Sequence, residues 1–167
     1  MSVREFTFEV KTEEEMLQFG NVLAKVCEPG CVVFLEGDLG VGKTTLVRGV
    51  LRALGHSGAV KSPTYTLVEQ YDFDEKRIYH FDLYRLGSPE ELEYMGGRDY
   101  FQANTISFIE WPMNAEGYLP EADLICVIKY QGMDQRLVQV NASSTLGEQM
   151  LIAIKKTNGL FSASLPG

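Results

Sequence analysis

The 167-residue sequence lacks long apolar segments, closely spaced cysteines and an excess of positive charge. Its longest apolar runs, CVVFL (31–35) and LICVI (124–128), are far shorter than the roughly 20 residues that span a bilayer as a helix. The first ten residues, MSVREFTFEV, contain no apolar export segment. We therefore expect a cytoplasmic protein rather than a membrane-spanning or exported one.

Cysteine is scarce and its spacing is uninformative for metal or redox chemistry. Cys27, Cys31 and Cys126 are odd in number, and no pair has the C-x-x-C spacing that zinc and redox sites favour. We interpret them as small buried side chains of a protein from a reducing compartment.

Basic residues are outnumbered, with 15 Lys and Arg against 23 Asp and Glu and a formal net charge of −8. Proteins that bind nucleic acid directly neutralise phosphates with clustered Lys and Arg. The composition therefore disfavours strong direct binding of DNA or RNA, and we expect any role on a nucleic acid to act through a partner.

The order of predicted elements indicates an α/β fold. Helical periodicity and capping signals predict helices, and short β-rich runs predict strands. The expected strands are 3–10, 31–37, 65–73, 77–85, 105–111, 123–130 and 136–142, and the expected helices are 12–26, 43–54, 88–95 and 144–156. The runs 65–73 and 77–85 flank DEK and predict a hairpin or a near-adjacent pair.

Strands alternate with helices in the first two thirds of the chain, and the end is richer in strands. This pattern predicts an α/β fold with a mainly parallel central sheet, flanking helices and some antiparallel strands. No linker divides the sequence, so we expect one domain over residues 1–156 and a loose tail over 157–167.

The strongest motif is GDLGVGKTT, residues 37–45, which stands between a predicted strand and a predicted helix. Gly37, Gly42, Lys43 and Thr44 satisfy the spacing G-x-x-x-x-G-K-[ST] of a phosphate-binding loop. Glycines let successive amides turn toward phosphate oxygens, and the helix adds its unpaired N–H groups. Lys43 is expected at the β- and γ-phosphates, the Thr44 hydroxyl at Mg²⁺, and Thr45 at the α-phosphate.

Two predicted strands end in a carboxylate that suits the metal side of this loop. Asp82 closes IYHFD, and Glu110 closes ISFIE. One is expected to hold Mg²⁺, directly or through water, and the other to orient or deprotonate the attacking water. The residues alone do not assign these two roles. His80 alternates with Asp82, and we interpret it as a packed histidine rather than a partner of that acid.

The stretch SPTYT, 62–66, follows the phosphate-loop helix and contains three hydroxyl side chains, Ser62, Thr64 and Thr66. Its position is typical of a loop whose order depends on the γ-phosphate, although a Ser-Pro turn explains it equally. The sequence contains no N-K-x-D guanine-reading run, which favours ATP. A small-molecule kinase and a non-hydrolysing, nucleotide-gated assembly module are the alternatives. A kinase would need an arginine-bearing lid over the phosphates, and Arg77, Arg85 and Arg98 are scattered in the sequence and form no compact lid segment.

Four motifs in order, GDLGVGKTT, SPTYTLVEQY, HFDLYRL and EWP, resemble the TsaE (YjeE) family of bacterial P-loop ATPases, over about residues 5–140. The resemblance implies slow Mg²⁺-dependent ATP hydrolysis in the biosynthesis of threonylcarbamoyladenosine (t6A), next to the tRNA anticodon. It also implies two partners, TsaB and TsaD, which form the transferring complex.

The resemblance also implies roles for individual residues. Thr44 and Glu110 resemble the Mg²⁺ ligands, Asp82 a required acid near the γ-phosphate, and Ser62, Thr64 and Thr66 a switch-like loop. Lys43, Asp82 and Glu110 are the expected catalytic residues. The implied nucleotide contacts are Thr12, Gly37, Asp38, Leu39, Gly40, Val41, Gly42, Lys43, Thr44, Thr45 and Arg136. Met113 and Asn114 follow EWP where some relatives carry a basic residue.

Overall fold

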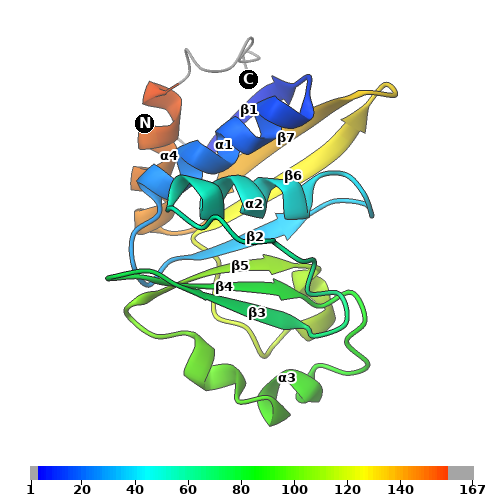
Figure 1. Ribbon diagram of the computed structural model, residues 1–167, viewed down its shortest axis with the longest axis vertical. Helices are drawn as coiled ribbons and strands as arrows, with labels where there is room; N and C mark the ends of the chain where they lie inside the picture. Colours follow the sequence, from blue (N-terminus) through cyan, green and yellow to red (C-terminus); the bar gives the residue numbers. More distant parts are fainter. Residues whose placement is uncertain (1–3, 158–167) are drawn as a thin grey trace.

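A single seven-stranded sheet organises the computed structural model, which describes residues 4–157 (Figure 1). The strand order is β1-β7-β6-β2-β5-β4-β3. The central strands β6, β2, β5 and β4 are parallel, whereas β1, β7 and β3 pair antiparallel at the two sides. The strands are β1 Glu5–Val10, β2 Val32–Glu36, β3 Val68–Asp72, β4 Arg77–Asp82, β5 Thr105–Glu110, β6 Leu124–Gln131 and β7 Gln135–Ala142. The predicted fold class is confirmed.

Helices α1 and α2 lie side by side across the sheet (Figure 1). The α-helices are α1 Glu13–Val26, α2 Lys43–Ala53, α3 Glu90–Tyr94 and α4 Thr145–Lys156, and short 3-10 turns cover Gly97–Tyr100 and Pro112–Ala115. Thr12 caps α1 as predicted, because its hydroxyl accepts from the Glu15 amide at 3.1 Å. Ser144 caps α4 through the Gly147 amide at 2.9 Å.

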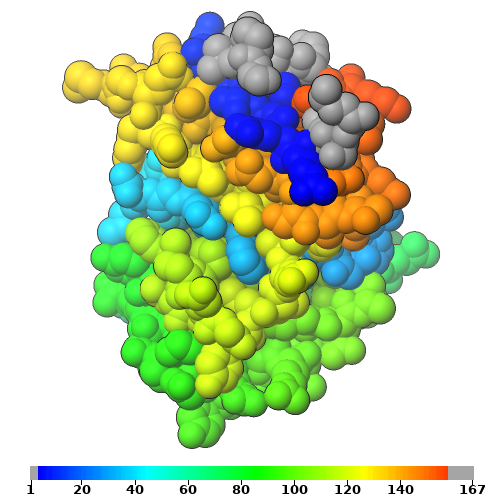
Figure 2. Space-filling view, turned by 180° about the vertical axis from the view of Figure 1, so that it is seen from behind, coloured from blue at the N-terminus to red at the C-terminus, as the bar shows by residue number. Residues whose placement is uncertain are grey.

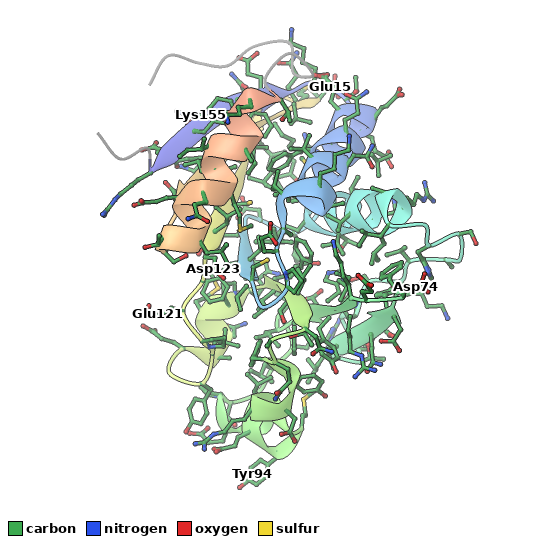
Figure 3. The ribbon with its side chains drawn as sticks, turned by 90° about the vertical axis from the view of Figure 1, so that its left-hand side faces the viewer. Glu15, Asp74, Tyr94, Glu121, Asp123 and Lys155 are labelled. Atoms are coloured by element: carbon green, nitrogen blue, oxygen red, sulfur yellow. The ribbon has the colours of Figure 1, made fainter. Side chains whose placement is uncertain are left out.

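The sheet separates two apolar clusters, because alternate residues of a strand face opposite sides. Ile78, Ile106 and Phe108 join the cluster that α1, α2 and α4 share, while Phe81 and Ile109 face the cluster beside α3. Figure 2 shows the molecule from behind, with the α3-to-β6 segment in green to yellow filling the lower half. Tyr94 of α3 lies at the end of the molecule away from Lys155 of α4 (Figure 3). The phosphate-loop helix α2 therefore lies on the larger core.

Helices α1 and α2 touch through two glycines. A Cβ at Gly20 would collide with the backbone of Leu46 and Gly49, and a Cβ at Gly49 would collide with the backbone of Leu17. Any larger residue at either position would push the helices apart, so their spacing is set by backbone against backbone.

The structure differs from the sequence-based prediction at two element starts. The strand predicted from residue 65 begins at Val68, because the Leu67 amide bonds the Pro63 carbonyl at 2.7 Å in a turn. The helix predicted from Ser88 begins at Glu90 with Pro89 as its cap. Of the predicted tail, 157–167, only Thr157 lies within the described residues. Between residues 4 and 157, no helix combines the length and apolar character needed to cross a membrane.

Candidate nucleotide and metal site

The loop between β2 and α2 has the backbone geometry that a phosphate cradle requires. Gly37 and Gly42 have φ values of 151° and 122°, in the region that side-chain-bearing residues rarely adopt. A Cβ at Gly37 would also lie 2.5 Å from the Ile128 carbonyl oxygen. Glycine at 37 is thus required twice, for its dihedral angle and for the close passage of β6.

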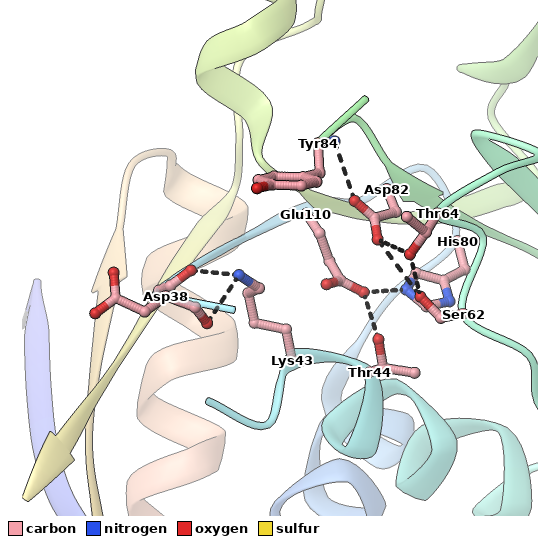
Figure 4. Close-up of polar contacts among 10 residues, drawn as sticks. Asp38, Lys43, Thr44, Ser62, Thr64, His80, Asp82, Tyr84 and Glu110 are labelled. Carbon is pink, nitrogen blue, oxygen red and sulfur yellow. Dashed lines mark hydrogen bonds and ion pairs between the residues drawn. The ribbon is translucent and has the colours of Figure 1, made fainter. Parts of the chain in front are cut away.

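Lys43 begins α2, and its side chain is folded back over this loop. The residue is only 4% exposed, and its ammonium donates to the carbonyls of Gly37 and Asp38 (Figure 4). The same ammonium lies 4.2 Å from the ring centroid of Trp111, a cation–π distance. Trp111 has a positive φ of 57°, so a left-handed backbone turn after β5 presents the indole to the lysine.

Burial lowers the pKa of the Lys43 ammonium below its ordinary value, because desolvation disfavours the charged form. The neighbouring carboxylates of Glu110, Asp82 and Asp38 act in the opposite direction and favour the charge. The loop therefore contains a poorly hydrated cation, which suits a multiply charged anion as its partner.

Glu110 ends β5 beside the first turn of α2, and it is almost completely buried. Its Oε2 accepts from the Thr44 hydroxyl at 3.0 Å and lies 2.6 Å from Nε2 of His80. His80 therefore pairs with Glu110. The interpretation of His80 as a packed residue is correct in its burial, with no exposed surface, but it misses this polar contact.

Asp82 ends β4 directly beside Glu110, since the two are register partners in the parallel pair β4–β5. Its Oδ2 accepts from the hydroxyls of Thr64 at 2.9 Å and Ser62 at 3.5 Å, and its Oδ1 accepts from the Tyr84 amide at 3.1 Å. The strand ends thus bring together two carboxylates from distant parts of the sequence, and the 62–64 turn is tied to one of them.

The third hydroxyl of the predicted switch-like loop is directed elsewhere. Thr66 donates to the Glu69 carboxylate at 2.9 Å and does not line the hollow that Ser62 and Thr64 line. The structure therefore brings two of the three predicted hydroxyls to the site.

A hollow of about 190 Å³ lies between these groups. Its walls are formed by the loop, the start of α2, the 62–64 turn and the two acids, namely Leu39, Gly40, Gly42, Lys43, Thr44, Thr45, Ser62, Thr64, Asp82 and Glu110. We call it the phosphate hollow. The Thr44 hydroxyl and the Glu110 carboxylate lie side by side, joined by a hydrogen bond of 3.0 Å to Oε2, and oxygen is the ligand that Mg²⁺ prefers.

No group of three or more His, Cys, Asp and Glu side chains that could hold a metal occurs within residues 4–157. This observation fits Mg²⁺, which commonly takes one or two protein oxygens and completes its shell with phosphates and water. The donor set fits the ion, and Thr44 and Glu110 are the residues that would hold it.

A second hollow, of about 520 Å³, lies on the other side of the loop. It shares Gly40, Gly42 and Thr45 with the phosphate hollow, and we call it the outer hollow. Thr12 and Arg136, both predicted to contact nucleotide, line it. They come from the α1 cap and from β7, so the fold joins two residues that lie far apart in the sequence.

Arg136 also supports the loop itself. Its Nε donates to the Val41 carbonyl at 2.8 Å, and its guanidinium lies 4.4 Å from the ring centroid of Tyr130. The Tyr130 hydroxyl in turn donates to the Leu39 carbonyl at 3.0 Å. The β6–β7 hairpin therefore holds two carbonyls of the loop from outside.

Several residues of the two hollows escaped the sequence-based prediction. The outer hollow is also lined by Val10, Glu13, Met16, Arg48, Met133 and Asp134. Met16 and Arg48 are regular helical residues and Met133 lies at a hairpin tip, so no spacing marks them. For His80 a signal existed, because its alternation with Asp82 places both side chains on one face of β4.

Comparison with known proteins assigns the chain to a family. The family model "Threonylcarbamoyl adenosine biosynthesis protein TsaE" matches residues 10–138. The chain is 50% identical over 149 residues to the TsaE protein of Haemophilus influenzae, covering 86% of this chain and 94% of that one. It is 37% identical over 129 residues to the TsaE protein of Bacillus subtilis, covering 77% and 80%.

The fold agrees with that assignment. A crystal structure of YdiB from Bacillus subtilis superposes with a TM-score of 0.79 at 30% identity, covering 95% of this chain and 99% of that one. The matched region contains the phosphate loop, both strand-end acids and Arg136. The chain belongs to the TsaE family of threonylcarbamoyl adenosine biosynthesis proteins.

Proposed function

We propose that the protein is a Mg²⁺-dependent ATPase of t6A biosynthesis in tRNA, formed by a single domain over residues 1–156. The observation that carries the proposal is the convergence of Lys43, Thr44, Asp82 and Glu110 on one hollow beside a glycine loop. The relatives from Haemophilus influenzae and Bacillus subtilis are named for t6A biosynthesis, which supports this pathway.

The triphosphate binds along residues 37–45 in this proposal. Loop amides and the N-terminus of α2 surround the phosphates, and Lys43 exchanges its carbonyl partners for phosphate oxygens. When bound, Mg²⁺ would neutralise phosphate charge. Thr44 and Glu110 would hold the ion, and the nucleoside would extend into the outer hollow between Thr12 and Arg136.

Asp82 is the acid that orients or deprotonates the attacking water. Its Oδ2 already accepts from Ser62 and Thr64, so any shift of Asp82 on loss of the γ-phosphate passes to the 62–64 turn. That turn changes the surface presented to partner proteins. We propose TsaB and TsaD as those partners, and the net charge of −8 favours leaving tRNA contact to them.

The geometry gives less support to a small-molecule kinase. Arg77 pairs with Asp72 and Arg98 with Glu93, while Arg85 lies over Tyr65. None of the three arginines lines the phosphate hollow as the structure describes it. An arginine lid over the phosphates is therefore not formed by these residues.

Lys43→Ala tests the assignment most directly. We expect at least about a hundredfold loss of ATP affinity, since a poorly hydrated charge pair with phosphate is lost. Calorimetry with a non-hydrolysable ATP analogue and Mg²⁺ measures this, with exposed Lys25→Ala as the matched control. Undiminished affinity in Lys43→Ala would reject the site. Phosphate release in a single turnover, with and without the partners, separates an ATPase from a non-hydrolysing module.

A further inference from the structure

His80 is a buried polar residue that the proposed chemistry does not use directly. It lies in the middle of β4 with no exposed surface, and its Nε2 is 2.6 Å from Oε2 of Glu110. Its other ring nitrogen, Nδ1, is buried and has no hydrogen-bond partner in the described part of the chain. Burying a polar ring costs free energy unless it is hydrogen-bonded, and His80 has a single such contact among the described residues to offset that cost.

The His80 contact is made to Oε2 of Glu110, an oxygen that has a second hydrogen-bond partner. Thr44 donates to this oxygen from one side, and Nε2 of His80 approaches it from another. A carboxylate only accepts, so Nε2 carries a hydrogen, and in the neutral ring Nδ1 is then a bare acceptor. This tautomer leaves an acceptor unpaired rather than a donor, which is the less costly arrangement.

The hydrogen bonds leave the other oxygen of Glu110 available. Figure 4 shows Oε2 directed toward His80 and Thr44, and the second oxygen directed toward Lys43. Without the His80 contact, the Thr44 hydroxyl would be the one hydrogen-bond donor left to this carboxylate among residues 4–157. That hydroxyl is itself an expected Mg²⁺ ligand, so it is not an independent anchor.

We propose that His80 is a positioning residue, which fixes the Glu110 carboxylate so that it meets Mg²⁺ in one orientation. The inference rests on the proposed function for the identity of the ion. Groups that hydrogen-bond a metal ligand typically affect metal affinity about 10- to 100-fold, and His80 stands in that relation to Glu110.

Two amide substitutions distinguish the ring nitrogens of His80. The side-chain nitrogen of Gln occupies roughly the position of Nε2, whereas that of Asn reaches only the position of Nδ1. His80→Gln therefore retains the donor to Glu110, while His80→Asn and His80→Leu remove it. These three variants and the wild type form one series, in which a purely structural role would not favour Gln over Asn in metal binding.

The experiment measures binding of a non-hydrolysable ATP analogue as Mg²⁺ is raised from a chelated start. For His80→Leu and His80→Asn we expect the half-saturating Mg²⁺ concentration to rise about tenfold, with metal-free affinity unchanged. His80→Gln is expected within about threefold of wild type. An unchanged Mg²⁺ requirement in His80→Leu, beside a normal wild-type response, would overturn this inference alone. Wild-type affinity that ignores Mg²⁺ would overturn the proposed function as well.

A measurement without metal or nucleotide covers variants that fail to fold. The chain has two histidines, so nitrogen-15 NMR of the wild type resolves the His80 ring against His56 alone. We expect the tautomer protonated at Nε2, and a change in its nitrogen shifts in Glu110→Gln. A neutral ring with its hydrogen on Nδ1 instead of Nε2, or shifts that do not respond to Glu110→Gln, would overturn the proposal.

Discussion

The phosphate hollow and the outer hollow share two loop glycines and Thr45 of α2, but they are built differently. The phosphate hollow is lined by buried Lys43, Asp82 and Glu110, each fixed by at least two polar contacts. The outer hollow has a buried apolar part formed by Val10, Met16 and Val41 and an open rim from the α1 cap and the β6–β7 hairpin, where Met133 is 92% exposed. Fixed charged groups suit phosphate and metal, and an apolar wall with an open rim suits a nucleoside.

This difference teaches where substitutions should matter most. In the phosphate hollow, removing one partner leaves a buried charge unsatisfied, which costs more than the bond itself. In the outer hollow, water replaces a lost contact. The predictions below test this contrast from the largest expected effect to the smallest.

Asp82→Asn should separate chemistry from binding. We expect ATP hydrolysis at saturating substrate to fall about a hundredfold, because a general base typically contributes at least that factor. ATP affinity should change less than about threefold, since Lys43 and the loop amides remain. Steady-state kinetics together with calorimetry measure both quantities. Asp72→Asn, on the same hairpin but exposed, is the control. Equal losses of rate and affinity would contradict the assigned role.

Thr64→Val and Thr66→Val form a matched pair within one loop. Thr64 donates to Asp82, whereas Thr66 donates to Glu69 on the surface. We expect Thr64→Val to slow hydrolysis about tenfold, the equivalent of one hydrogen bond to a charged group, and Thr66→Val to change it little. A rate assay decides. Similar effects of both substitutions would show that the loop acts as a whole and not through Asp82.

Arg136→Ala probes the outer hollow. We expect ATP affinity to fall about three- to tenfold, as for one hydrogen-bonded contact open to water. Inorganic tripolyphosphate, which has no nucleoside, is the comparison ligand. If Arg136 contacts the nucleoside, only ATP binding weakens. If both ligands weaken equally, Arg136 acts through its bond to the Val41 carbonyl, and the contrast between the hollows is smaller than we propose.

The pH dependence of stability tests the burial of Lys43. Its folded-state pKa lies below its unfolded value, so the unfolded chain binds the proton more tightly. The cost of charging the buried amine is fully present below the folded pKa and disappears as pH rises toward the unfolded one. Relative to Lys43→Met, the free energy of unfolding of the wild type should therefore rise through this alkaline interval. Urea denaturation of both proteins measures it, and a falling difference would contradict the burial argument.

The central features of the fold and site were predictable because they follow from local rules. The loop spacing fixed Gly37 and Lys43, and parallel strands that end in Asp82 and Glu110 must place both at one edge of the sheet. The register that makes these acids neighbours was not predictable, since it depends on which strands pair.

The remaining features depend on tertiary contacts that no local pattern encodes. The bond from His80 to Glu110 joins two strands and residues 30 positions apart. The residues around a buried histidine do not show whether it makes such a bond. Ser62, Thr64 and Thr66 all carry a hydroxyl, so their sequence does not show which of them face the site. In the structure a turn at Leu67 follows them, and Ser62 and Thr64 face Asp82 whereas Thr66 faces Glu69. Thr12 and Arg136 were placed by resemblance alone, and the structure puts them in one hollow.

The contact between Gly20 and Gly49 links the geometry of the two hollows. Helix α1 starts from Thr12 in the outer hollow, α2 starts from Lys43 in the phosphate hollow, and the helices touch without intervening side chains. Because this contact is backbone against backbone, side-chain repacking cannot adjust the distance between the two helices. A methyl group added at either glycine would therefore change the geometry of both hollows at once.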